Sequence, residues 1–168
     1  MKGQWAKGMA PRHFAWVIRD RLATCERIGG YGASHRRVRR AEEIVWVKAQ
    51  GFTCVVSTLA SPHNLHAYEE AGLPAHHLPL GRGDELVAGL EAVFVDVRAL
   101  LVAGERVLVH DDDVGDRVQG LLAGYLVHAG LVPEQTRAVA MMERLLLRPL
   151  GPPGRELVAL AQRLAVQP

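Results

Sequence analysis

Apolar residues recur along the chain with two different periods, and the two kinds of segment alternate. Short runs rich in β-branched and other apolar residues are typical of buried strands, whereas apolar residues three or four apart are typical of helices. The alternation predicts a single α/β domain over 1–168, with a mostly parallel central sheet flanked by helices. Strands are expected in 14–22, 52–59, 75–80 and 106–110, and helices in 35–50, 61–72, 84–103, 117–129, 133–147 and 153–165.

Two of these helices begin after residues that favour a helix start. Ser34 is expected to be the N-cap of the helix over 35–50, and Gly51 is expected to follow its last turn. Asp84 precedes the long apolar helix and is expected to cap it in the same way. One face of the first helix is formed by Val38, Ala41, Val45 and either Lys48 or Ala49.

Length and composition set the outer bounds. A chain of 168 residues with 49% hydrophobic content is large enough for one globular domain with its own core. Residues 1–11 are expected to form a flexible N-terminal extension, and they lack the apolar centre of a signal peptide. Glu91, Asp96 and Arg98 interrupt the longest apolar run, so no membrane span is expected and the protein is predicted to be cytoplasmic.

The two cysteines, Cys25 and Cys54, do not have the spacing of metal ligands. This argues against a disulfide scaffold and against a zinc site. Cys54 lies inside an apolar strand-like run and is expected to be a small core residue. We therefore expect no resident metal and no cofactor.

Positive charge is concentrated in the first third of the chain. Residues 1–48 carry eleven Lys or Arg and four acidic residues, whereas the remainder carries nine and fourteen. The densest basic cluster could bind nucleic acid, an acidic protein or a phosphorylated ligand. We favour a solvated helix face that pairs with Glu42 and Glu43, and nucleic acid is not expected because no aromatic residues are interleaved with the arginines. The cluster consists of Arg36, Arg37, Arg39 and Arg40.

The segment 106–118 has the frame of a phosphate-binding loop. An apolar run from Arg106 to Val109 leads to His110, and Arg117 opens an apolar helical segment seven residues later. A strand, a tight loop and a helix N-terminus in this order point backbone N–H groups and the positive end of a helix dipole at an anion.

This frame resembles the catalytic loop of protein tyrosine and dual-specificity phosphatases, in which His-Cys, five residues and Arg follow one another. The resemblance implies a Cys thiolate as nucleophile and an Arg that clamps the phosphate. His110 and Arg117 stand at the matching positions, but Asp111 stands where the Cys belongs. Across roughly 12–165, further segments similar to the family are 14–22, 51–59, 77–80, 124–134 and Arg148-Pro149.

Other positions of the loop also depart from that family. Val114 stands where the family has Gly, and Gly115 comes one position late. Val118 replaces the Ser or Thr that assists release of the thiolate. The resemblance therefore covers the frame of the loop and not its chemistry.

The resemblance also implies an Asp that acts as general acid, and this chain has no Asp at the corresponding position. The expected position of this Asp falls on Gly81 or Arg82, and Asp84 is a displaced candidate. His76 and His77 precede this segment on a strand, where side chains alternate, so at most one of them faces the site.

Four aspartates crowd the loop. Two unit charges about 6 Å apart repel by roughly 3 kcal/mol at an effective dielectric near 20, and a phosphate dianion would meet the same repulsion. A carboxylate is also a weaker nucleophile than a low-pKa thiolate. We therefore expect a catalytically inactive, pseudophosphatase-like module that binds a protein or a phosphorylated ligand, with Arg117 paired to the aspartates. The four are Asp111, Asp112, Asp113 and Asp116, and Asp113 or Asp116 is expected to cap the helix that follows.

An alternative keeps the chain an enzyme, with Asp111 as the nucleophile of a metal-dependent phosphatase. A strand followed by Asp111-x-Asp113 is similar to the first motif of haloacid-dehalogenase-type phosphatases, but that family needs further Asp residues and a Lys, and neither occurs after Asp116. A cation bound adventitiously in the acidic loop stays open, because hard cations favour carboxylate oxygens. A third interpretation is that Asp111 is an engineered replacement of a native Cys. However, the shifted Gly115 and the apolar Val118 indicate that the whole loop has diverged from the family pattern.

Overall fold

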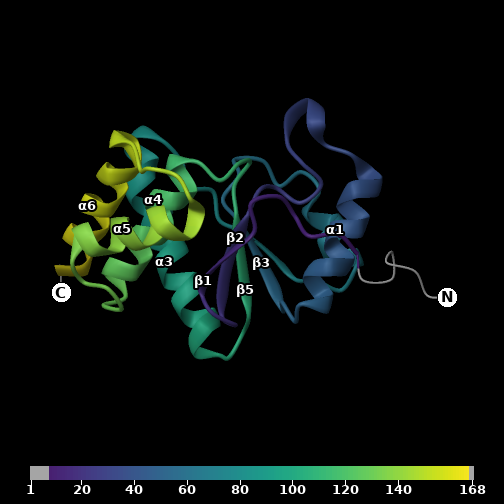
Figure 1. The fold of residues 1–168 in the computed structure, drawn as a ribbon, viewed down its shortest axis with the longest axis horizontal. Coiled ribbons are helices and arrows are strands. Elements are labelled where there is room, and N and C mark those ends of the chain that lie inside the picture. The colour runs from purple at the N-terminus through teal and green to yellow at the C-terminus, as the bar shows by residue number, and fades with distance from the viewer. Residues whose placement is uncertain (1–7, 167–168) are drawn as a thin grey trace.

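The computed structural model of the chain describes residues 8–166 and shows a five-stranded sheet between two layers of helices (Figure 1). The strand order is β1-β2-β5-β3-β4; β1 runs antiparallel to β2, and all other neighbours are parallel. The predicted α/β class with a mostly parallel sheet is therefore confirmed. The strands are β1 Ala15–Ile18, β2 Leu22–Cys25, β3 Cys54–Ser57, β4 Ala75–His77 and β5 Val107–His110.

The helices divide unequally between the two faces of the sheet. Helices α1 and α2 cover one face, and α3 to α6 cover the other (Figure 1). No helix within the described part of the chain is long and apolar enough to cross a membrane. The helices are α1 Arg37–Ala49, α2 Leu65–Glu70, α3 Leu86–Val102, α4 Asp116–His128, α5 Gln135–Leu146 and α6 Pro152–Val166, with short 3-10 turns η2 Gly32–Ser34 and η3 Gly83–Glu85.

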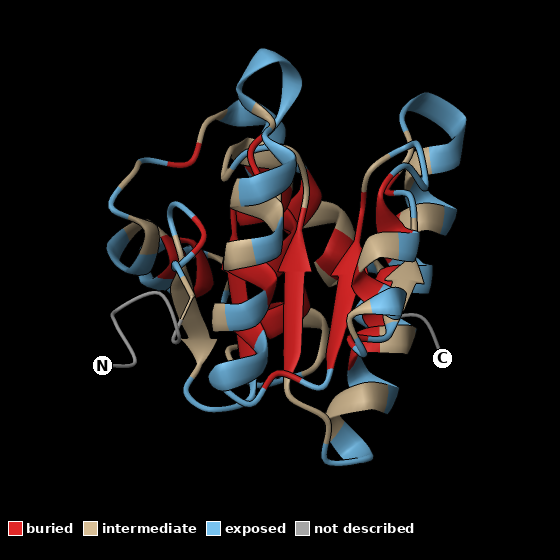
Figure 2. Cartoon of the chain, turned by 90° about the vertical axis from the view of Figure 1, so that its right-hand side faces the viewer, coloured by how far each residue is buried: buried red, intermediate tan, exposed pale blue. Residues whose placement is uncertain are grey.

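Strand β5 lies at the centre of the sheet and is buried on both faces (Figure 2). Val107 and Val109 belong to the core on the side of α3 and α4, whereas Leu108 belongs to the core under α1 and α2. Because side chains alternate along a strand, this explains why the sequence of β5 is apolar without interruption. Cys54 and Cys25 are both free and buried. This confirms the core position predicted for Cys54, whereas the core position of Cys25 at the end of β2 was not predicted.

The close packing of α4 against α6 depends on glycine. A Cβ atom at Gly120 would lie 2.6 Å from the carbonyl oxygen of Gly154, so the two backbones meet without side chains between them. This contact holds the first turn of α6 beside the first turns of α4. It also places the segment before α6 next to the loop that follows β5.

The start of α1 differs from the prediction. The helix begins at Arg37, its N-cap is Arg36, and no side chain caps it. Ser34 ends η2 instead, where its hydroxyl donates to the carbonyl oxygen of Tyr31 at 2.7 Å. The Ser34 N-cap prediction is therefore wrong, because the serine closes a tighter turn within its own segment.

The orientation of α1 is set by residues that the apolar pattern did not single out. Val38 is 76% exposed and Val45 is 42% exposed, so the face that carries them is turned to solvent. The buried residues are Glu43, Ile44 and Val47. Helix α1 thus buries the charged Glu43 beside Ile44 and Val47, while Val38 and Val45 stay outside.

Glu43 is held inside by an internal ion pair. Its carboxylate accepts hydrogen bonds from the backbone N–H of Gly29 and from Arg39 Nε, the latter at 2.8 Å. A guanidinium nitrogen of Arg39 also lies 3.8 Å from the buried carboxylate of Glu26. The prediction of a solvated face is therefore wrong for Arg39 and Glu43, which tie α1 to the turn after β2. Burial raises the pKa of Glu43 against these hydrogen bonds.

The expected N-terminal extension is only partly described. Residues 1–7 lie outside the described range. Within the rest, the N–H of Met9 donates to the carbonyl oxygen of Glu42 at 3.1 Å, and Pro11 is buried. Residues 9–11 are thus held against α1.

Candidate functional site

The loop of interest starts at the carboxyl end of the central strand, where parallel sheets commonly place their binding sites. His110 closes β5 and is fully buried, and its Nδ1 donates to the carbonyl oxygen of Asp111 at 2.9 Å. Burial lowers the pKa of His110 and outweighs this hydrogen bond and the nearby Asp111 charge, which act to raise it. His110 is therefore a neutral residue that shapes the start of the loop.

Asp111 occupies the nucleophile position of the frame, and both of its carboxylate oxygens are engaged. One oxygen accepts a hydrogen bond from the Thr58 hydroxyl at 2.7 Å, and the other accepts the N–H of Asp112 at 2.7 Å. Thr58 is itself fixed, because its N–H donates to the carbonyl oxygen of His110 at 3.0 Å. The carboxylate is thus oriented by the strand end beside it and by its own loop.

Arg117, at the clamp position, points to a carbonyl and not to a carboxylate. Its guanidinium donates to the carbonyl oxygen of Gly81 at 2.9 Å. Within residues 8–166 it forms no ion pair, so the expected pairing of Arg117 with the aspartates is wrong. Burial lowers the pKa of Arg117, and the charge of Asp111 counteracts that shift. The side chain reaches across to the segment before α3 and fastens it to α4.

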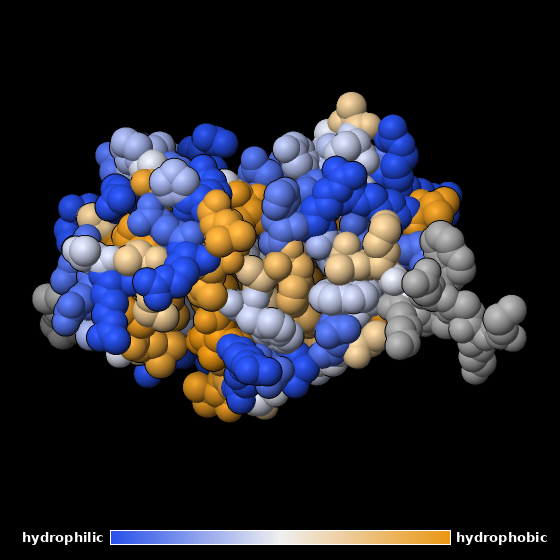
Figure 3. Space-filling view, in the orientation of Figure 1, coloured by the Kyte–Doolittle hydropathy of each residue, from blue (hydrophilic) through white to orange (hydrophobic). Residues whose placement is uncertain are grey.

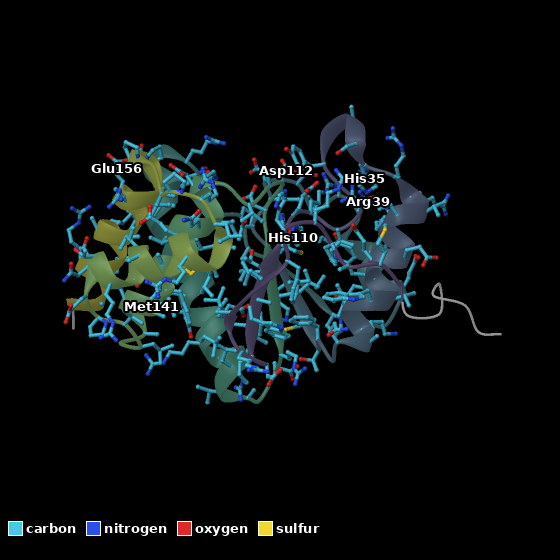
Figure 4. All side chains as sticks on the ribbon, in the orientation of Figure 1. His35, Arg39, His110, Asp112, Met141 and Glu156 are labelled. Carbon is cyan, nitrogen blue, oxygen red and sulfur yellow. The ribbon has the colours of Figure 1, made fainter. Side chains whose placement is uncertain are left out.

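Asp112 fastens the other side of the loop. Its carboxylate lies 3.6 Å from a guanidinium nitrogen of Arg27, and its carbonyl oxygen accepts the N–H of Arg27 at 3.0 Å. Partial burial raises the pKa of Asp112, and the Arg27 charge opposes this. The loop is therefore joined to the segment that follows β2. Figure 4 shows Asp112 above His110, on the side of the molecule that carries Arg39.

Asp116 is the first residue of α4, but its carboxylate accepts hydrogen bonds at the N-terminus of α6. It accepts hydrogen bonds from Arg148 at 2.9 Å, from the N–H of Gly151 at 3.1 Å and from the N–H of Gly154 at 3.4 Å. Burial acts to raise the pKa of Asp116, but these hydrogen bonds outweigh it and the pKa is lowered.

The expectation that Asp113 or Asp116 caps α4 is wrong. The N-cap of α4 is Gly115, and no side chain caps this helix. The physical reason is that the N-terminus of α6 attracts the Asp116 carboxylate, as helix N-termini do for anions. Asp113 is exposed, and its carboxylate lies beside Gly115.

The apolar replacements in the loop have clear places. No residue from 110 to 118 has a left-handed backbone, and Gly115 is extended with φ −113°. Val114 is therefore unstrained, and it packs against the core at the side of α4. Val118 is buried at 1% exposure, so it faces the core and not the loop cavity.

Two hollows meet at Asp111 and Arg117, which line both. The smaller has a volume of about 320 Å³ and the larger of about 670 Å³. Together they carry five acidic and three basic side chains, so the combined surface has a net negative charge. The smaller is lined by Thr58, Leu59, Ala60, Gly81, Arg82, Glu85, Asp111, Asp112 and Arg117, and the larger by Asp111, Asp113, Gly115, Asp116, Arg117 and residues 148–151 and 153.

Among the expected general-acid positions, Gly81 and Arg82 line the smaller hollow, but Asp84 does not. Asp84 is exposed within η3, and α3 begins after Glu85 without a side-chain cap, so the N-cap prediction for Asp84 is wrong. Glu85 is the carboxylate of this segment that reaches the hollow. The sequence pattern does not single out Glu85, because the spacing in the phosphatase family places the acid further upstream.

The two histidines of β4 lie outside both hollows. Nε2 of His77 lies 2.7 Å from the carbonyl oxygen of Leu59, and Nδ1 of His76 lies 3.1 Å from the Asp96 carboxylate. Within residues 8–166, no three His, Cys, Asp or Glu side chains gather in an arrangement that would hold a metal ion. The four aspartates diverge, since Asp111, Asp112 and Asp116 each bind a different partner.

No family model matches the chain, and no curated protein matches it in sequence. Its fold is that of the protein tyrosine and dual-specificity phosphatases. One similar structure is the kinase associated phosphatase with a serine in place of its catalytic cysteine, at a TM-score of 0.77 and 17% identity, covering 95% of this chain and 99% of that one.

Two further structures support the same fold. Tk-PTP in its active form gives a TM-score of 0.68 at 16% identity, with 90% of this chain and 97% of the other covered. A putative phosphatase from Shewanella putrefaciens gives 0.65 at 16% identity, with 94% and 95% covered. Identities of this size show a shared fold, so activity has to be argued from the site.

Proposed function

We propose that this protein is a binding or regulatory module with a phosphatase fold and without Cys-dependent phosphatase activity. The observation that carries the proposal is the state of Asp111. Its carboxylate stands at the nucleophile position, and it is fixed there by Thr58 and by the N–H of Asp112. A fixed anion at the base of the loop repels the phosphate dianion that a phosphatase has to bind.

The remaining residues of the site support the same proposal. Arg117 is bound to the carbonyl oxygen of Gly81, and the position of the assisting hydroxyl is a buried valine, Val118. With five acidic against three basic side chains, the two hollows favour a cationic group of a partner protein over a phosphate. Asp113 is exposed at the larger hollow and is available for such a group.

One observation favours a second candidate, phosphomonoester hydrolysis with Asp111 as nucleophile. Arg82 and Arg117 line the same small hollow as Asp111 and Glu85. In this scheme an Asp111 oxygen attacks phosphorus while the bond to the leaving alkoxide breaks, and the alkoxide takes the proton of the protonated Glu85 carboxyl. Water then attacks the acyl phosphate and gives a proton back to Glu85, which releases phosphate and restores both side chains. A metal-dependent form of this mechanism lacks support, because no three His, Cys, Asp or Glu side chains among the described residues are arranged to hold a metal ion.

Activity measurements separate the two candidates. The purified chain is assayed with an aryl phosphate under reducing conditions, with chelator and with added Mg²⁺. We expect no turnover in either condition. Turnover that disappears in Asp111→Ala but persists in Asp113→Ala would establish the hydrolytic candidate and overturn the binding proposal.

Binding is tested with two small probes of similar shape and opposite charge, benzamidine and phenyl phosphate. We expect benzamidine to shift the backbone resonances of residues 111–117 in an NMR titration and phenyl phosphate to leave them unchanged. Asp113→Asn should weaken the benzamidine shifts. Saturable binding of phenyl phosphate at the loop, without any effect of benzamidine, would contradict the preference for a cationic group.

A further inference from the structure

Helix α3 is apolar on all sides. Thirteen of its 17 residues are apolar, and the other four are Gly89, Glu91, Asp96 and Arg98. A helix of this composition is normally covered all round. One face does pack into the core, and its buried residues are Leu90, Val93, Phe94 and Val97.

The opposite face of α3 is open. Its apolar residues follow one another at steps of four, three, four and three, which is the spacing of a helix seam that packs against another helix. Val95 is 61% exposed and Val102 is 81% exposed. A single exposed apolar residue is common, but several in a row on one helix face form a continuous apolar patch, which is typical of an interaction surface. The seam consists of Ala88, Ala92, Val95, Ala99 and Val102.

Two hollows accompany the seam. A shallow one of about 550 Å³ runs along most of it, from Ala88 to Ala99, and includes Leu78 from the segment after β4. A second, of about 290 Å³, lies between the end of α3, β1 and the start of the α4–α5 connection, where Leu131 is 57% exposed. Figure 3 shows apolar atoms gathered between α3 and β1, on the face turned to the viewer.

The charges beside the seam have a specific arrangement. Glu91 and Arg98 lie seven residues apart on one flank, and neither forms an ion pair with another residue of 8–166. Asp96 lies on the other flank, where it is paired with His76. The seam therefore offers one free anion and one free cation on the same side.

We propose that a second copy of this chain covers the α3 seam, with the two α3 helices packed antiparallel about a two-fold axis. In that arrangement, Ala92 of each copy lies opposite Val95 of the other, and positions on the same flank meet. Glu91 then meets Arg98 of the second copy, and the symmetric pair forms as well. A parallel arrangement brings Glu91 onto Asp96 of the second copy, which is repulsive.

The size of the surface fits a dimer that extends beyond α3. A helix of 17 residues is about 25 Å long, whereas a stable interface takes about 800 Å² from each partner. The exposed Leu131 and the half-buried Leu78 flank the seam and add to the contact. The small side chains of Ala88, Ala92 and Ala99 allow the two helices to approach closely.

The experiment measures the mass of the full chain in solution by sedimentation velocity over a range of concentrations. We expect a reversible dimer. Val95→Glu should raise the dimer dissociation constant at least about tenfold, because it places unpaired carboxylates in the centre of the contact. Val38→Glu, at an exposed position on α1, is the matched control and should leave the dimer intact.

Charge exchange tests the antiparallel arrangement itself. Glu91→Arg and Arg98→Glu should each weaken the dimer, and the double variant should restore it. Both positions are at the surface, so thermal melting should show unchanged monomer stability. A chain that stays monomeric at the highest concentration, or a dimer that Val95→Glu does not weaken, overturns the proposal. Failure of the double variant to recover overturns the antiparallel pairing.

Discussion

The hydroxyl of Thr58 donates to the carboxylate of Asp111 at 2.7 Å and thereby joins the ends of two neighbouring strands, β3 and β5. Thr58 is 2% exposed, so this bond is shielded from water. Hydrogen bonds to charged groups contribute more than neutral ones, and a buried acceptor that loses its donor is destabilising.

We therefore expect Thr58→Val to lower the free energy of unfolding by about 1–3 kcal/mol at neutral pH. Valine has the shape of threonine, so the change removes the donor with little loss of packing. Thr58→Ser keeps the hydroxyl and should remain closer to the parent. Chemical denaturation measures both variants; equal midpoints for Thr58→Val and the parent would show that Asp111 does not depend on this bond.

The contacts of Asp116 predict a pH-dependent contribution to stability. Its pKa in the folded protein lies below the ordinary 3.8, so its stabilising effect is present above that value and is lost as pH falls through the folded pKa. Asp116→Asn should cost about 1–2 kcal/mol near pH 7 and much less near pH 3. Asp113→Asn is the control, because Asp113 is exposed. A constant difference between Asp116→Asn and the parent at both pH values would refute the linkage.

Burial of His110 predicts a second loss of stability on acidification, nearer to neutral pH. Burial lowers its pKa below the ordinary 6.5, so the unfolded chain binds a proton more readily than the folded one. Its contribution is present above pH 6.5 and declines as pH falls below that value. His35 and His128, whose pKa values are also lowered, chiefly by burial, add to the same decline.

We accordingly expect the free energy of unfolding of the parent to fall between about pH 7 and pH 5, and His110→Gln to make that slope smaller. The slope is the relevant quantity, since any substitution of a buried residue also changes packing. His66→Gln, at an exposed position on α2, serves as the control and should keep the slope of the parent. An unaltered slope in His110→Gln would count against a neutral, buried imidazole.

A cysteine introduced at position 111 is expected not to make the protein a phosphatase. In Asp111→Cys the thiolate would still lack a hydroxyl to assist its release, because Val118 points into the core, and Arg117 would remain bound to Gly81. Aryl phosphate turnover should stay at background. Turnover comparable to that of an active phosphatase would show that the rest of the loop has a catalytic geometry and that Asp111 alone prevents activity.

The sequence predicted the sheet, the order of the helices and the loop frame, because these depend on the spacing of apolar residues over long segments. It misplaced the buried side of α1, where Glu43 is inside and Val38 outside. Apolar spacing does not reveal a carboxylate that is satisfied by a distant backbone N–H such as that of Gly29. Contacts between segments far apart in the chain decided this case.

The same limit applies to the candidate site. The positions of Asp111 and Arg117 followed from the frame, but their partners, Thr58 and Gly81, come from other segments. The family has Gly where this chain has Val114, yet no residue of 110–118 uses a left-handed conformation that would require glycine. Local sequence therefore predicted the position of the loop and could not supply its hydrogen bonds.

The position of Asp116 has a consequence for how the loop responds to a ligand. Its carboxylate belongs at once to the first turn of α4 and to the N-terminus of α6, so the end of the loop cannot move without loosening both helices. Together with Arg27 on Asp112, this makes the loop a preorganised surface. A ligand that fits it gives up little free energy to conformational ordering, and one that needs the loop to close around it is disfavoured.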